Sequence, residues 1–144
     1  MQSFSYPARL DPDEDGRFVV KFRDLPHGMT DGADRSEALA EAVGLLESVL
    51  AHIVQDDLDV PTPSSPRRNE VLISPSAVTA AQVALYAAMR QERVSHKELS
   101  KRLGLPVGET RRLTDLAKYP PLQTIERALA TLGHRLTIAL DAAE

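Results

Sequence analysis

The apolar residues that follow Asp34 recur every three or four positions, which is the period of one face of an α-helix. This face comprises Leu39, Ala42, Val43, Leu46, Val49, Leu50 and Ile53. Asp34 can accept a hydrogen bond from the amides of the first turn, and Glu37 can reach back toward the start of the helix, as in a capping box. The pattern therefore predicts an amphipathic helix that begins after Asp34 and ends near Gln55.

Shorter β-like runs flank this helix. Residues 4–10 and 17–23 are rich in β-forming residues, and the Asp, Pro and Gly residues of DPDEDG between them favour a turn. They predict a β-hairpin, with a short third strand near Met29. Residues 70–74, EVLIS, are another short β-like run, which can return to the same sheet.

A connection and a long helix come next along the chain. Residues 57–69 contain three prolines and two serines without an apolar period, so they are expected to form a connection. Ser74 and Pro75 are expected to supply the cap and the first-turn proline of an alanine-rich helix over residues 76–92.

Short helices and one strand are expected after Val94. Gly104 separates a helix that begins at Ser95 from one that begins about Pro106, and LQTIERALATLG predicts a third helix. In RLTIAL, residues 135–140, apolar and polar residues alternate as in a strand with one buried face. That strand would pair either within the monomer or between two subunits.

These elements predict an α+β fold. Residues 1–75 are expected to form a small antiparallel sheet with a helix, and residues 76–144 an all-α unit with the additional C-terminal strand. Residues 1–66 hold five Lys or Arg and thirteen Asp or Glu, a balance of −8, whereas residues 67–144 hold twelve and eight, a balance of +4. This asymmetry indicates two modules with different partners, one of them nucleic acid. The alternative is that solvated faces simply differ in charge.

The amino-acid composition limits the cellular location of the protein and the kinds of site that it can contain. The chain contains no cysteine, which excludes disulfides, thiolate metal sites and thiol catalysis and fits a reducing cytoplasm. The N-terminus turns acidic before an apolar run of signal-peptide length develops, and the longest apolar segment, AVTAAQVALYAAM, is too short to span a bilayer. We therefore expect a soluble cytoplasmic protein that makes no membrane contact.

The stretch SHKELSKRLGLPVGETRRL, residues 95–113, has the pattern of a helix-turn-helix, in which two helices meet at a steep angle around a tight turn. Gly104 suits the turn, Ser100 is small where the helices approach, and Thr110 is polar at an expected apolar position. The apolar residues that would hold the pair together are Leu99, Leu103, Leu105 and Leu113. The alternative is a purely structural helical hairpin.

Residues 90–118 carry eight Lys or Arg and four acidic residues, a local excess of positive charge that favours binding to phosphates. On this interpretation, arginines of the second helix read promoter DNA in the major groove and lysines of the first helix contact phosphates. The candidate DNA-binding residues are Ser95, Lys97, Lys101, Arg102, Val107, Arg111 and Arg112. Alternatively, the two arginines pair with Glu109 or Asp115 on the surface. Because one module neutralises few phosphates, a homodimer or higher homo-oligomer is expected.

Catalysis is not indicated. Five aspartates of the first half suggest a two-metal nuclease, but most of them lie in turn sequences, where aspartate is a common turn former. These aspartates are Asp11, Asp13, Asp24, Asp31 and Asp34. His27 is a lone histidine in a turn, and the sequence contains no GxSxG, HExxH, phosphate-loop or GxGxxG motif. We expect no enzymatic activity, no cofactor and no metal.

Residues 6–50 resemble the N-terminal domain of the HicB antitoxins. The shared features are a Tyr-Pro start, an acidic turn that ends in glycine, an aromatic-valine strand, an Asp-Leu-Pro turn, Thr-x-Gly, and Glu-Ala at the helix start. They are carried by Tyr6, Pro7, Gly16, Phe18, Val20, Asp24, Leu25, Pro26, Thr30, Gly32, Glu37 and Ala38. The VPTPS segment, residues 60–64, is similar to the family's proline-serine exit, and the C-terminal part resembles its helix-turn-helix variant. Arg23, His27 and the run from Pro106 to Gly108 depart from the family pattern.

The resemblance implies a truncated RNase H-like domain that lacks catalytic carboxylates and covers the active site of a HicA toxin, a small basic ribonuclease that degrades mRNA. It also implies a helix-turn-helix that represses the promoter of the two genes. An acidic partner would be steered to a basic toxin. We expect the toxin to contact exposed apolar side chains and their neighbours, namely Phe18, Phe22, Arg23, Asp24, Leu25, His27 and Met29. The alternative function is an orphan transcriptional regulator whose N-terminal domain dimerises or senses a ligand.

Overall fold

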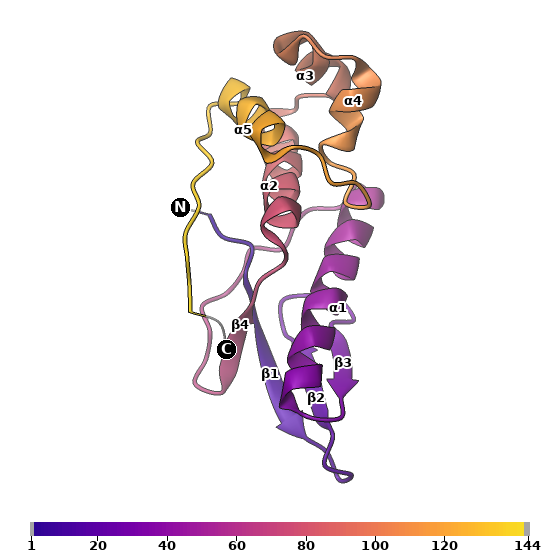
Figure 1. Ribbon diagram of the computed structural model, residues 1–144, viewed down its shortest axis with the longest axis vertical. Helices are drawn as coiled ribbons and strands as arrows, with labels where there is room; N and C mark the ends of the chain where they lie inside the picture. The colour runs from indigo at the N-terminus through magenta and orange to yellow at the C-terminus, as the bar shows by residue number, and fades with distance from the viewer. Residues whose placement is uncertain (1, 143–144) are drawn as a thin grey trace.

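A hairpin and two added strands form the sheet. The computed structural model describes residues 2–142 (Figure 1). β1 (Tyr6–Pro12) pairs with β2 (Phe18–Phe22), β3 (Met29–Gly32) adds to β2, and β4 (Glu70–Ile73) adds to β1. The strand order is β3-β2-β1-β4, and every pair is antiparallel. The predicted hairpin, the third strand and the returning strand are confirmed, and so is the mixed α+β class.

α1 (Arg35–Gln55) lies across one face of this sheet (Figure 1). The Asp34 side chain accepts the Glu37 amide at 2.8 Å, as predicted. The Glu37 carboxylate accepts the amide of Ala33, one residue before the cap, and so satisfies a further donor at the helix start. β3 comes so close to α1 that a Cβ on Gly32 would collide with the Ala38 backbone. The close contact between β3 and the first turn of α1 therefore fixes the position of the helix on the sheet.

The first core fills the space between the sheet and α1. It comprises Tyr6, Ala8, Val20, Phe22, Leu25, Ala38, Ala42, Leu46, Leu50, Ile73 and Val83. Burial of each large aliphatic side chain contributes about 1.5–3 kcal/mol. Val83 comes from α2 (Ala77–Glu92), so the second half of the chain contributes to this core.

α2 begins at a different cap from the predicted one. The Ser76 side chain, and not that of Ser74, accepts the Thr79 amide at 3.2 Å. The predicted use of Ser74 and Pro75 as cap and first-turn proline is therefore wrong. Ser74 instead lies within hydrogen-bonding distance of Ser5, 2.6 Å between the hydroxyl oxygens, directly after β4.

A second core forms between α2 and three shorter helices, α3 (His96–Leu103), α4 (Val107–Arg112) and α5 (Leu122–Thr131). Its members are Ala81, Leu85, Ala88, Met89, Leu99, Leu103, Leu113, Ile125, Ala128, Leu129 and Leu132. Figure 1 shows α3 and α4 at the upper end of the molecule and α5 beside α2. No helix in the described part of the chain is both long and apolar enough to cross a membrane.

Polar contacts of α2 fix the second core relative to the sheet. Gln82, which is fully buried, donates from Nε2 to the Asp115 carbonyl at 2.8 Å, in the connection between α4 and α5. The Tyr86 hydroxyl donates to the Leu58 carbonyl at 2.5 Å, and Arg90 forms ion pairs with Asp57 and Asp59. α2 is therefore bonded both to the segment that leaves α1 and to the segment that follows α4.

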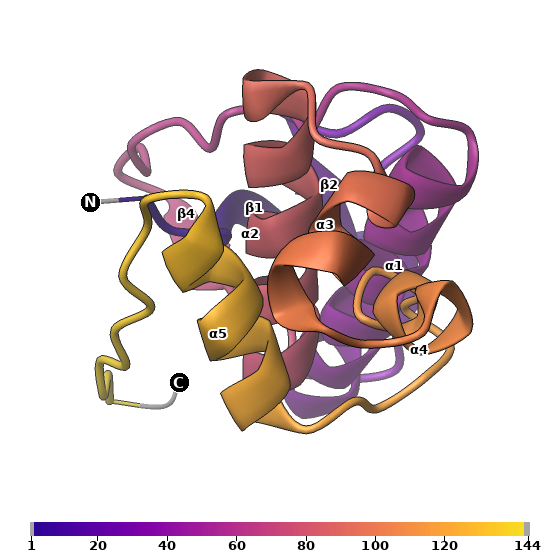
Figure 2. The same ribbon diagram turned by 90° about the horizontal axis from the view of Figure 1, so that it is seen from above.

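Residues 135–140 form no strand in the described structure, so the predicted C-terminal strand is absent from the monomer. After α5 the chain runs as an extended coil past the N-terminal segment (Figures 1 and 2). The alternation of apolar and polar residues is not sufficient to form a strand, because a strand also requires a neighbour for its backbone amides and carbonyls.

Candidate functional site

α3 and α4 form a two-helix unit, called here the α3–α4 pair. The Ser95 side chain accepts the Glu98 amide at 3.1 Å and caps α3, which ends at Gly104 with φ +69°. This left-handed conformation favours glycine and lets α4 start after only two further residues. Thr110, polar at an expected apolar position, is fully buried and donates its hydroxyl to the Pro106 carbonyl at 3.1 Å. Thr110 is therefore compatible with the tight packing of the pair.

Exposed cations cover the outside of the α3–α4 pair. Lys97, Lys101, Arg111 and Arg112 are all exposed, and none of them has a carboxylate partner among residues 2–142. The alternative expectation, that Arg111 and Arg112 pair with nearby acids, is therefore not met in this structure. Arginines elsewhere do pair with acids, as Arg9, Arg17, Arg23 and Arg90 show. The positive charge of this surface is thus left available for an external anion.

Arg102 differs from its basic neighbours. Its Nε lies 3.4 Å from the Glu98 carboxylate, and its Nη1 donates to the Thr131 carbonyl at 3.1 Å, at the end of α5. Arg127 of α5 donates in return to the Leu103 carbonyl at 3.3 Å, at the end of α3. Positive side chains at these helix ends stabilise carbonyls that lack helical partners. Arg102 therefore fastens α3 to α5, a role that the sequence did not indicate.

His96 is a second residue of this unit that sequence reasoning missed. Its Nε2 lies 2.8 Å from the Thr114 hydroxyl and so joins the start of α3 to the end of α4. Burial, followed by the positive charge of Arg111, lowers the pKa of His96 below its ordinary value of 6.5, against an opposing effect of Asp57. The folded protein therefore favours the neutral ring.

The lowered pKa of His96 predicts that folding stability falls as the pH drops below about 6.5. The unfolded chain then takes up a proton that the folded ring resists, so stability present above pH 6.5 is progressively lost. Denaturant unfolding at pH 7.5 and pH 5.5 should show a smaller loss for His96→Gln than for the wild type. His27→Asn, at an exposed position, should keep the wild-type loss. Equal losses in the wild type and His96→Gln would contradict the prediction.

The predicted toxin-contacting residues lie in two different environments. Phe22 and Leu25 are only 4% and 6% exposed and belong to the first core, so the expectation that they are available on the surface is wrong. Phe22 lies opposite Ala8 on the sheet face that α1 covers, and Phe18 is half-buried against the same core. His27 and Met29 are exposed, Met29 by 61%. Of the apolar candidates, Met29 is therefore the one that projects into solvent.

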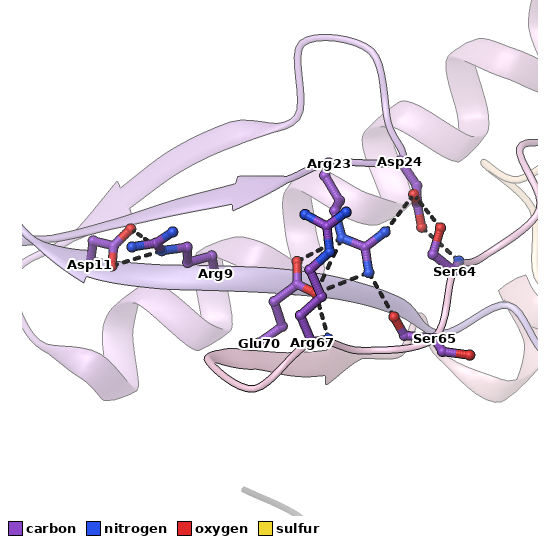
Figure 3. Close-up of polar contacts among 8 residues, drawn as sticks. All are labelled: Arg9, Asp11, Arg23, Asp24, Ser64, Ser65, Arg67 and Glu70. Carbon is purple, nitrogen blue, oxygen red and sulfur yellow. Dashed lines mark hydrogen bonds and ion pairs between the residues drawn. The ribbon is translucent and has the colours of Figure 1, made fainter.

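Arg23 and Asp24 fasten the proline-serine connection to the sheet (Figure 3). The Asp24 carboxylate accepts the Ser64 amide at 2.7 Å and the Ser64 hydroxyl at 2.8 Å. Arg23 binds the Glu70 carboxylate at 3.0 Å and donates to the Ser65 carbonyl at 2.6 Å. The hydrogen bond from Arg23 is the largest effect that lowers the pKa of Glu70. Both residues thus have structural partners, and the Asp-Leu-Pro turn serves the fold itself.

Met29 lies in a row of side chains across the sheet. Lys21 is opposite Met29 on one side and opposite Arg9 on the other, and Arg9 is opposite Glu70. These positions alternate with buried Val20 and Ala8, so the row lies on the face that points away from the first core. We call the residues Arg9, Lys21 and Met29 the outer row.

The five aspartates considered for a metal site are used within the fold. Asp34 caps α1, Asp13 accepts the Asp15 and Arg17 amides in the hairpin turn, and Asp24 binds Ser64. The other two form ion pairs, Asp11 with Arg9 at 2.8 Å and Asp31 with Arg17 at 3.0 Å. Within residues 2–142, no group of three or more His, Asp or Glu is arranged to hold a metal ion.

Comparison with known proteins identifies the family. A model of the HicB_like antitoxin of bacterial toxin-antitoxin system matches residues 5–84, from β1 into α2. Antitoxin HicB 2 of Photorhabdus laumondii is 34% identical over 137 residues, which cover 95% of this chain and 96% of the relative. Antitoxin HicB of Escherichia coli K12 is 28% identical over 135 residues, 94% and 98% of the two chains, and that of Pseudomonas fluorescens is 30% identical over 132 residues, 91% and 90%. The resemblance noted in the sequence is confirmed, and the chain belongs to the HicB-like antitoxin family.

Proposed function

We propose that this antitoxin neutralises a HicA-type mRNA-degrading toxin by covering its active site, and that it represses its own promoter through the α3–α4 pair. The observation that carries the DNA-binding part is the group of exposed, unpaired cations on a pair of helices in a protein whose net charge is −4. Membership of an antitoxin family supports the toxin-binding part. On this proposal the protein is a non-enzymatic regulator that acts in the cytoplasm, where both partners occur.

The first unit, residues 1–75, would be a truncated RNase H-like domain that binds the toxin. Residues 1–66 have a charge balance of −8, which steers the protein toward a basic ribonuclease. Met29 and His27 are exposed at the start of strand β3, whereas half-buried Phe18 is opposite Gly32 at the other end of that strand. Because β3 is an edge strand, the toxin can approach it without first displacing another part of the sheet.

The second unit, residues 76–144, would be a helix-turn-helix DNA-binding domain that acts as a dimer. α3 would cross the phosphate backbone and α4 would enter the major groove. Lys97 and Lys101 then contact phosphates, whereas Arg111 and Arg112 reach guanine edges, where one arginine can form two parallel hydrogen bonds. The first residues of α4, Val107 and Gly108, have little polar reach, so base recognition depends mainly on the two arginines.

Co-expression tests the toxin-binding part. The full chain should form a stable complex with the small basic protein encoded beside its gene and restore growth when that protein is induced. Met29→Lys should weaken the complex by at least tenfold, because it places a positive charge against a basic partner. The matched control is Leu72→Lys, since Leu72 is also exposed but lies on the opposite edge strand.

The outcomes separate the two candidate functions. A complex that forms with wild type and is weakened only by Met29→Lys supports the antitoxin proposal and its surface. Absence of any complex, together with binding to the promoter, would instead support the orphan regulator. Equal weakening by both lysine variants would overturn the assignment of the β3 side as the toxin surface.

A further inference from the structure

A hollow of about 420 Å³ lies between α4 and α5, beside the helix that is proposed to read DNA. Three of the residues around it are cations, Arg112, Lys118 and Arg127, and one is an acid, Glu109. Its apolar lining includes Leu113, Tyr119 and Pro120. The hollow therefore combines an excess of positive charge with apolar walls, which suits an anionic ligand.

The connection from α4 to α5, residues 113–121, borders this hollow and is held firmly to α2. Gln82, fully buried in α2, donates to the Asp115 carbonyl at 2.8 Å and to the Lys118 carbonyl at 3.4 Å. The Lys118 amide also donates to the Asp115 carbonyl, at 2.9 Å. Two consecutive prolines, residues 120–121, then lead into α5. The backbone around Lys118 is thus restrained before any ligand binds, which lowers the entropic cost of binding.

Two neighbouring side chains of the connection are exposed and serve no contact within the fold. Tyr119 is 82% exposed, and Lys118 is exposed without a carboxylate partner among residues 2–142. The other two tyrosines of the chain, Tyr6 and Tyr86, are buried and donate their hydroxyls to backbone carbonyls. Lys118 and the Tyr119 hydroxyl are therefore available as donors to an external ligand.

The position of the hollow indicates which ligand it takes. Arg112 belongs both to α4 and to the lining of the hollow, so the hollow begins at the end of the proposed base-reading helix. Phosphates line both edges of the major groove, and a surface that continues from a helix in that groove meets the DNA backbone. Lysine, arginine and tyrosine side chains all bind DNA phosphates. A backbone phosphate therefore matches the charge, the exposed donors and the location of this hollow.

We propose that the hollow between α4 and α5 binds one phosphate of the operator backbone, through the Lys118 ammonium group and the Tyr119 hydroxyl. Arg112 and Arg127 add positive charge to the same hollow. The contact is independent of base sequence and fixes the register of α4 in the groove, because phosphate contacts position a protein on the duplex. This inference rests on the proposed DNA binding by the α3–α4 pair and adds a contact surface outside that pair.

Three substitutions in the full chain test the contact. Lys118→Ala should weaken binding to promoter DNA and to a scrambled duplex equally, roughly threefold or more at about 50 mM salt, and reduce the slope of log affinity against log salt by about 0.9. Tyr119→Phe removes an uncharged donor, so it should weaken binding to both duplexes without changing that slope. Lys21→Ala is the matched control, because Lys21 is also exposed but lies on β2 of the sheet. It should change neither the affinities nor the slope.

Replacement of single promoter phosphates by neutral methylphosphonates locates the contact. Wild type should lose affinity at one backbone position at which Lys118→Ala loses none, because the variant has already lost the contact to that phosphate. A lysine that acted only through the fold would weaken binding at every position and leave the pattern of sensitive phosphates unchanged.

The outcomes separate this inference from the proposed function. If wild type binds the promoter specifically but Lys118→Ala binds as tightly, or shares every sensitive phosphate with wild type, the hollow is no phosphate site and the reading role of α4 stands. If wild type itself does not distinguish the promoter from the scrambled duplex, the proposed DNA binding fails and the inference fails with it.

Discussion

Replacement of both Arg111 and Arg112 by alanine is expected to remove sequence-specific binding to the promoter while leaving the fold intact. A bidentate arginine–guanine contact contributes about 1–3 kcal/mol of discrimination, so loss of two such contacts weakens specific binding by roughly 30-fold to more than 1,000-fold. Both side chains are exposed and have no ion-pair partner in the described residues, so their truncation leaves no buried group unsatisfied. Titration of promoter DNA and of a scrambled duplex measures the effect.

Lys97→Ala and Arg68→Ala are the matched comparisons. Lys97→Ala should weaken binding to both duplexes equally and reduce the slope of log affinity against log salt by about 0.9, because it removes one phosphate contact. Arg68→Ala removes an exposed positive charge from the segment before β4. It should change neither the affinity for the two duplexes nor the salt slope. Retention of specific binding by the double arginine variant would reject α4 as the reading helix. The toxin complex of this variant should remain at wild-type strength, since the substitutions lie outside the proposed toxin surface.

Elements that depend on local signals were predictable from the sequence. α1 follows from its apolar period and from Asp34, whose side chain does cap the helix. The two hairpin strands follow from β-forming residues on either side of an acidic turn. α3 and Gly104 were predicted for the same reason, because a cap and a left-handed turn are properties of a few consecutive residues.

Features that depend on distant parts of the chain were not predictable. Phe22 is buried and Met29 exposed because α1 covers only one face of the sheet, and the sequence of the strands does not say which face. Arg23 was predicted to contact the toxin as a neighbour of exposed apolar side chains, but its ion-pair partner Glu70 is 47 residues away. Arg102 likewise bonds to a carbonyl of α5 that no local pattern reveals.

The position of α2 changes how the two proposed units are related. The sequence suggested a division after residue 75, yet Val83 belongs to the first core and Leu85, two residues later, to the second. Buried Gln82 binds the connection between α4 and α5, while its Oε1 has no hydrogen-bond partner in the described structure. α2 is therefore part of both cores and not a flexible linker.

Gly32→Ala is expected to cause the largest loss of stability among conservative substitutions in the first core. The added Cβ would collide with the backbone of Ala38 and the carbonyl carbon of Glu37, and these atoms cannot move without displacing the first turn of α1. Overpacking typically costs about 1–3 kcal/mol, and a clash with rigid backbone belongs at the upper end of that range. This collision gives a physical reason for the glycine of the Thr-x-Gly motif. Thermal and denaturant unfolding measure the loss.

Gly44→Ala is the matched control, because the same methyl group is added within α1 itself. No neighbouring atom lies within 4 Å of a Cβ at Gly44, and alanine favours the helix interior over glycine by up to about 1 kcal/mol. The two glycine substitutions should therefore change the free energy of unfolding in opposite directions. If Gly32→Ala is as stable as Gly44→Ala, the close approach of β3 to α1 does not constrain the fold, and the motif glycine must serve another purpose. If Gly32→Ala is destabilised but still folded, displacement of β3 should also weaken the toxin complex, since Met29 lies on that strand.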